Sequence, residues 1–240
     1  MARALLLRRD LKDRKQEQEG VPWRISDSGT TREERLNEKV IAYPERQLPP
    51  GGGVKEYKAA RKSGARAFTL WADPDRRQVY AHVTTEQTAK DGAVYQVVSP
   101  AGEPLAVVTR RPALRGGGVR ARWTVQPVGQ PPAVGYKGRI GWWCAWWLLS
   151  PVWFAVAALC IVGALLGGGD GDVPRMPRRV VWRAGGRQVL DARSASGGYR
   201  LQVPDDSGWD WWDPRVTAAV VALLNSHAGL LGLNWDADRD

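Results

Sequence analysis

The sequence predicts a mainly β protein: an antiparallel, barrel-like β-domain around a hydrophobic C-terminal helix, with an apolar helical membrane segment and a disordered basic N-terminal tail. Three observations support this fold class. Short runs of β-forming residues alternate with turn signals from residue 65 onward, a helix that is apolar on nearly every face begins at Pro214, and no charged residue occurs between Ile140 and Gly169. The 240 residues, 43% of them hydrophobic, are enough for one sizeable core.

Residues 1–62 are expected to form a basic, mostly disordered tail. They are highly charged, they show almost no alternation of apolar and polar residues, and a Pro-Pro-Gly-Gly-Gly break occupies positions 49–53. A short basic amphipathic helix containing Leu5–Leu7 and Leu11, resting on a membrane surface, is one interpretation of the first residues. A solvated helix or plain disorder is the other.

The basic residues are concentrated in the first part of the chain. The formal charge is +10, and the whole excess lies before residue 141, where 26 Lys and Arg face 15 Asp and Glu, whereas the remainder holds 9 and 10. A basic region suits an anionic partner, which is either nucleic acid or the anionic face of a membrane.

Residues 63–139 and 170–240 are expected to hold the two parts of the β-domain. Both parts contain runs of β-branched and aromatic residues bounded by Gly, Pro, Asp and Ser, which is typical of strands linked as hairpins. The predicted strands are Phe68–Trp71, Gln78–Thr84, Ala93–Val98, Pro104–Arg110, Gly118–Gln126, Arg179–Arg183, Arg187–Ala192 and Tyr199–Val203.

The strand predicted at 118–126 has the clearest alternation, with Val119, Ala121, Trp123 and Val125 on the face expected to be buried. A second pattern links the two parts of the domain, because the sequence from Trp71 to Ala81 resembles that from Trp182 to Ala192. This repeat indicates that the material on both sides of the apolar segment belongs to one β-architecture, and chance similarity of two degenerate copies is the alternative.

The segment 140–169 is predicted to enter a membrane because it is long, uncharged and apolar on every face, and a buried core helix is the alternative. Ser150-Pro151 divides it into two arms, each shorter than the roughly 20 residues that a full crossing needs, so a Pro-kinked single span and a re-entrant hairpin both stay open. Hydropathy alone favours the Pro-kinked single span, whereas balanced basic flanks and the repeated hairpin unit favour the re-entrant hairpin. The residues that mark the segment are Trp142, Trp143, Trp146, Trp147, Pro151, Trp153 and Phe154.

A helix is predicted at 213–227. Asp213 is a suitable N-cap and Pro214 occupies the first helical position, where its missing N–H costs nothing. The helix is too short to cross a bilayer and apolar on nearly every face, so it is expected to be enclosed by protein. Its buried residues are expected to be Val216, Val220, Leu223 and Leu224.

Hairpin-linked strands that end in one apolar helix resemble the tubby C-terminal-like superfamily, which includes the phospholipid scramblases and the LURP-one-related proteins. The matching parts are residues 68–84, 95–110 and 180–203 and the terminal element from Trp209 to Leu231. The resemblance implies a closed antiparallel barrel around a hydrophobic C-terminal helix, here with a membrane segment inserted. It implies no catalytic residue, and phosphoinositide binding and lipid transfer are activities that differ between its members.

Basic residues near the membrane segment are the candidate contacts for lipid headgroups, and an ordinary solvated face is the alternative interpretation. Trp123 is expected on the buried face opposite these cations, which argues against nucleic-acid binding, because that binding needs aromatic side chains among the exposed cations. His82 and His227 lack partners at ligand or triad spacing, so neither a metal nor a cofactor nor a catalytic residue is expected. The candidate contacts are Arg110, Arg111, Arg115, Arg120, Arg122, Lys137 and Arg139.

These observations predict a membrane-anchored, non-catalytic lipid-binding or scaffold protein with a tubby-like β-domain, rather than an enzyme. Its expected partners are membrane lipids, anionic ones included, and its expected location is the plasma membrane with the soluble parts facing the cytoplasm. A scramblase-like phospholipid transporter is the first alternative. A single-span membrane protein of unrelated fold and a hydrolase hidden in the barrel mouth are ranked lower.

Overall fold

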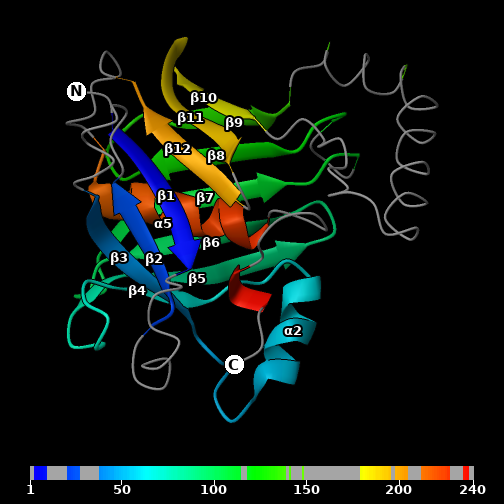
Figure 1. The fold of residues 1–240 in the computed structure, drawn as a ribbon. Helices are drawn as coiled ribbons and strands as arrows, with labels where there is room; N and C mark the ends of the chain where they lie inside the picture. The colour runs from blue at the N-terminus through cyan, green and yellow to red at the C-terminus, as the bar shows by residue number, and fades with distance from the viewer. Residues whose placement is uncertain are drawn as a thin grey trace, which may run out of the picture.

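The computed structural model describes residues 3–9, 21–27, 38–114, 118–138, 141, 148, 179–195, 198–204, 212–227 and 235–237. Within these residues, twelve antiparallel strands follow one another around a closed barrel, and β1 pairs with β12 to complete it. The barrel surrounds one long helix, α5, which runs through its centre (Figure 1). The strands are β1 (Arg3–Arg9), β2 (Trp23–Asp27), β3 (Lys39–Arg46), β4 (Phe68–Trp71), β5 (Val79–Ala89), β6 (Gly92–Val98), β7 (Pro104–Arg111), β8 (Arg122–Pro127), β9 (Ala133–Lys137), β10 (Val180–Ala184), β11 (Arg187–Ala195) and β12 (Gly198–Val203).

Helix α5 (Pro214–Ser226) begins and is buried as the sequence predicts. The Asp213 side chain accepts a hydrogen bond of 2.8 Å from the backbone N–H of Arg215, and proline follows the cap directly. Every residue from Val216 to Ser226 is buried, and this includes the four apolar side chains expected in the core. Because the helix is apolar on nearly every face, a closed sheet is needed to cover it. A closed sheet also has no unpaired edge strands.

The expectation of a disordered N-terminal tail is wrong for the described residues. The strands β1, β2 and β3 complete the barrel, and α2 (Val54–Lys62) follows them. Leu5–Leu7 belong to β1, where pairing with β2 and β12 buries them, so they do not form an amphipathic helix. The physical reason is that one of the two strands that pair with β1 is β12, at the far end of the sequence, and local patterns carry no sign of such a partner.

Two further corrections concern the middle of the barrel. The strand expected from Gly118 begins only at Arg122, and Val119, expected in the core, lies 76% exposed in the preceding turn. Strand β9 was not expected from the sequence, since Gly135 interrupts its pattern. A Cβ atom at Gly135 would lie 2.8 Å from the ring atom Cδ2 of Trp182, so only glycine fits under this ring.

The strands on either side of the apolar segment belong to one barrel, as the repeated hairpin unit predicts, and they are neighbours in it. Lys137 of β9 pairs with Val180 of β10, and just beyond this pair the backbone N–H of Gly138 donates a 2.7 Å hydrogen bond to the carbonyl of Arg179. The segment 140–169 with its marking residues lies outside the described residues, apart from Gly141 and Leu148. Within the described part of the chain, no helix has the length and apolarity to span a membrane.

Candidate functional site

Arg110 lies near the end of β7 with its side chain on the inner face of the barrel, where Ala106 and Val108 of the same strand are fully buried. Its guanidinium carbon is 5.8 Å from the ring centroid of Trp123, the neighbour across to β8. No described residue forms an ion pair or a hydrogen bond with the side chain of Arg110. Burial lowers the pKa of Arg110, because the charged guanidinium loses water. Arg110 is therefore an inward-facing cation that lacks a counter-charge in the described part of the chain.

Arg110 and Lys137 share a small cavity of about 30 Å³ at the end of the barrel where α5 finishes. The ammonium nitrogen of Lys137 lies 5.9 Å from the ring centroid of Tyr199. A cavity of this size holds a water molecule or two, so a headgroup does not fit within it. None of its described lining residues is acidic; they are Arg110, Ala121, Trp123, Lys137, Tyr199, Leu224 and His227.

A larger cleft of about 660 Å³ adjoins Arg110 on its other side. Its walls come from the end of α2, the turn between β5 and β6, and the end of β7. A volume of this size lies within the range of ligand sites, which is roughly 300–1,000 Å³. The described lining carries three cations and no acid, so positive potential is focused in the cleft. The lining residues are Lys62, Ser63, Gly64, Thr88, Ala89, Lys90, Gly92, Ala93, Arg110, Pro112 and Ala113.

We call the barrel end that contains this cleft and the small cavity the basic mouth. It is the end at which α5 finishes and near which α2 and the short helix η3 (Trp235–Ala237) lie, as Figure 1 shows. The hydrogen bond between Gly138 and Arg179 lies at the same end, because β9 ends and β10 begins there.

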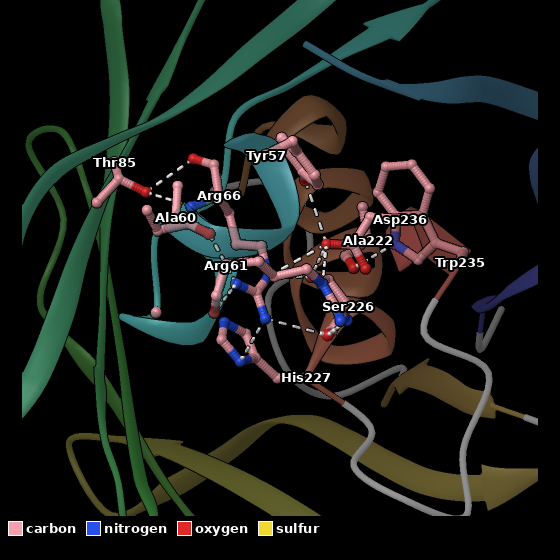
Figure 2. Close-up of polar contacts among 12 residues, drawn as sticks. Tyr57, Ala60, Arg61, Arg66, Thr85, Ala222, Ser226, His227, Trp235 and Asp236 are labelled. Carbon is pink, nitrogen blue, oxygen red and sulfur yellow. Dashed lines mark hydrogen bonds and ion pairs between the residues drawn. The ribbon is translucent and has the colours of Figure 1, made fainter. Parts of the chain in front are cut away.

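Two other arginines near the mouth are paired, and they close the C-terminal end of α5 (Figure 2). Nη2 of Arg61 donates to the carbonyl of Ser226 at 2.8 Å, and Nη2 of Arg66 donates to the same carbonyl at 3.4 Å, so the exposed end of the helix is satisfied. The carboxylate of Asp236, 1% exposed, accepts from Nε of Arg61 at 2.8 Å and from Oγ of Ser226 at 2.7 Å, and it lies 3.2 Å from Nε of Arg66. The hydroxyl of Tyr57 also donates to this carboxylate, at 3.2 Å.

His227 follows α5 and connects the paired arginines with the mouth. Arginine can only donate, so Nη2 of Arg66 donates to Nδ1 of His227 at 3.3 Å. His227 therefore carries its proton on Nε2 and donates to the Tyr95 hydroxyl at 2.8 Å, which in turn donates to the Gly64 carbonyl at 2.8 Å. Burial, followed by the charges of nearby arginines, holds the pKa of His227 well below its ordinary value, so the ring is neutral. Burial likewise raises the pKa of Tyr95 to about 12.

The structure divides the expected headgroup contacts between two faces. Arg110 and Lys137 line the small cavity and face inward, so Arg110 shares the face of Trp123 instead of lying opposite to it. Arg111 is exposed, and Arg120 covers the outer face of β9, where its guanidinium lies 4.8 Å from the ring centroid of Tyr136. Arg122 alternates with the inward-facing Trp123 along β8 and so belongs to the outer face as well.

Arg115 and Arg139 lie outside the described residues. Sequence reasoning missed Lys62 and Lys90, which enter the cleft from α2 and from the turn between β5 and β6. Lys62 was not predicted as a site residue because residues 1–62 were interpreted as a disordered tail. Lys90 follows an unremarkable polar run, and no local signal distinguishes it from any other surface lysine.

Comparison with known proteins adds no relative: no family model, no curated protein and no solved structure matches this chain.

Proposed function

We propose that this chain is a membrane-attached, non-catalytic lipid-binding protein built on a tubby-like barrel, and that its basic mouth receives lipid headgroups. The closed antiparallel barrel with a buried C-terminal helix supports the first half of this proposal, because the resemblance to the tubby C-terminal-like superfamily implies this architecture. Two features of the described residues support the second half: Arg110 has no counter-charge among them, and the lining of the cleft beside it holds no acid.

The observation that carries the proposal is the hydrogen bond of 2.7 Å between Gly138 and Arg179. These two residues are in contact although the charge-free run 140–169 lies between them in the sequence. Strands cannot pair through a hydrocarbon layer about 30 Å thick, and β9 pairs with β10, so both ends of the run belong on one side of a bilayer. Of the two topologies open from the sequence, this favours the re-entrant hairpin, with the barrel on the cytoplasmic side of the plasma membrane.

If the run enters a bilayer at this end of the barrel, the cations of the basic mouth lie near the surface of the leaflet. Lys62, Lys90 and Arg110 line the cleft, and Lys137 lines the adjoining cavity. Near an anionic leaflet, each basic residue contributes about 1 kcal/mol of attraction. The apolar run provides attachment to any bilayer, and the mouth adds a preference for anionic headgroups.

Flotation of the chain with liposomes tests this proposal. We expect binding to phosphatidylcholine vesicles and tighter binding when phosphatidylserine is included. The triple variant Lys62→Gln, Lys90→Gln, Arg110→Gln, which removes the three cations that line the cleft, should lose the preference for phosphatidylserine and keep the basal binding. Arg77→Gln is the matched control, because Arg77 is 81% exposed in the turn between β4 and β5, at the opposite end of the barrel.

Failure to float with either lipid contradicts membrane attachment. Equal binding to both vesicle types contradicts headgroup recognition. Movement of labelled lipid between leaflets, measured on the same vesicles, would favour the scramblase-like transporter instead.

A further inference from the structure

The hairpin between β7 and β8 presents two aliphatic side chains to solvent at the basic mouth. Leu114 is 84% exposed and Val119 is 76% exposed, whereas the aliphatic residues of the barrel strands mostly fill the core. The N–H of Leu114 donates to the carbonyl of Gly118 at 2.7 Å. Leu114 has a φ of 64°, in the left-handed region that a bulky side chain rarely adopts. Neither burial nor backbone preference therefore accounts for a leucine at this position.

This hairpin is held beside the strand from which the apolar run departs. Nη1 of Arg120 donates to the carbonyl of Gly138 at 3.0 Å, and the N–H of Lys137 donates to the carbonyl of Ala121 at 2.9 Å. Tyr136, which is 39% exposed, lies under the Arg120 guanidinium. The exposed aliphatic side chains, a tyrosine and the guanidinium of Arg120 thus lie near the strand that precedes the charge-free run.

A lipid leaflet is the partner that matches this chemistry. Aliphatic side chains enter the boundary between headgroups and acyl chains, tyrosine is enriched at that depth, and arginines pair with anionic headgroups above it. A stable protein interface buries roughly 800 Å² on each partner, and two aliphatic residues on a narrow hairpin do not provide the centre of such a surface. The continuity with the apolar run also points to a bilayer.

We propose that Leu114 and Val119 insert into the headgroup boundary of an anionic leaflet, as a second membrane contact beside the run 140–169. This inference rests on the proposed function, and it adds the orientation of the barrel. The basic mouth faces the leaflet, so its cleft opens toward the headgroups. The turn between β8 and β9, which carries the 60% exposed Val128, faces away from the membrane.

An environment-sensitive fluorophore tests the orientation directly. Single cysteines are placed at Leu114→Cys and, as the matched control, at Val128→Cys, in the full chain with Cys144→Ala and Cys160→Ala. Each is labelled with nitrobenzoxadiazole and mixed with vesicles of phosphatidylcholine and phosphatidylserine. We expect a blue shift at position 114, together with quenching by nitroxide-labelled acyl chains, and neither effect at position 128.

An unlabelled pair measures how much the hairpin contributes to binding. Leu114→Asp should weaken vesicle binding about tenfold, since an aliphatic contact is lost and a charge meets the anionic leaflet, whereas Val128→Asp should leave it unchanged. Both positions are exposed, so both variants are expected to fold.

The outcomes separate the two proposals. If the chain floats but the label at position 114 stays as accessible as that at position 128, the insertion inference is wrong and membrane attachment stands. If the chain does not float at all, the proposed function itself fails.

Discussion

The backbone N–H of Gly138 donates a 2.7 Å hydrogen bond to the carbonyl of Arg179, although the whole apolar run lies between these residues in the sequence. The run is therefore an insertion into the hairpin of β9 and β10, and the barrel closes without it. The basic mouth, the exposed hairpin of β7 and β8 and the departure of the run all lie at this one end.

Val220 lies in the middle of α5 and is fully buried. The substitution Val220→Asp places an unpaired charge in a dry core, which costs several kcal/mol against a total stability of about 5–15 kcal/mol. We expect loss of the cooperative unfolding transition, followed by circular dichroism during urea titration. Val128→Asp, at an exposed turn, should unfold like the original chain. A cooperatively folded Val220→Asp protein would contradict the enclosure of α5 by the barrel.

Asp236 is the carboxylate that balances the buried Arg66 and the partly buried Arg61. Replacing it in Asp236→Asn leaves these cations without their counter-charge, and breaking a buried pair in this way costs about 3–5 kcal/mol. Asp75→Asn is the control, because the ion pair of Asp75 with Arg77 is exposed and should contribute less than about 1 kcal/mol. The free energy of unfolding from urea titrations measures both. If Asp236→Asn lowered the free energy of unfolding by less than about 1 kcal/mol, the contacts of η3 with the end of α5 would not contribute to stability as we expect.

The neutral His227 predicts how stability depends on pH. The pKa of His227 is held well below its ordinary value in the folded chain, whereas the unfolded chain titrates near 6.5. Above pH of about 6.5 neither state binds the proton, so the full stability is present; below it only the unfolded state binds the proton, and stability falls by up to about 1.4 kcal/mol per pH unit.

Unfolding free energies measured between about pH 5.5 and 7.5 check this dependence. As the pH falls, the unfolding free energy of His227→Gln should decrease less than that of the original chain. The difference should be up to about 1.4 kcal/mol per pH unit, because the histidine that binds the proton in the unfolded state is absent. His82→Gln is the matched variant for comparison, because it removes the other histidine, which lies in β5 with Nδ1 3.2 Å from Oγ1 of Thr69. Identical slopes in the original chain and in His227→Gln would contradict a buried, neutral His227.

Much of the barrel was predictable where a strand has one buried and one exposed face. The strand predicted at 68–71 has the same bounds as β4, and those at 93–98 and 104–110 differ from β6 and β7 by one residue. Helix α5 was predictable from its cap and its apolar sequence. In each case the signal is local, since alternation and capping are read within a few neighbouring residues.

The missed strands lack that local signal for particular reasons. In β1 all of Ala4–Leu7 are buried, so no alternation appears. Strand β3 contains Pro44, paired with Leu70, and proline normally argues against a strand within a sheet. At the site, Arg110 and Lys137 were predicted from their position near the apolar run, whereas Lys62 and Lys90 were not predicted. The inward direction of Arg110 was not predictable, because arginine is rarely buried without a partner.

The parts of the chain before and after the apolar run form one barrel, and we propose that this barrel lies on one side of a membrane. Single cysteines at Ala101→Cys, in the turn between β6 and β7, and at Arg187→Cys, at the start of β11, report the two parts, in the Cys144→Ala, Cys160→Ala background. Cells with intact membranes are treated with an impermeant thiol reagent, and permeabilised cells show that both positions can react. We predict that both are protected in intact cells. Labelling of position 187 alone would mean that the run spans the bilayer, and a barrel in which β9 pairs with β10 would then be impossible.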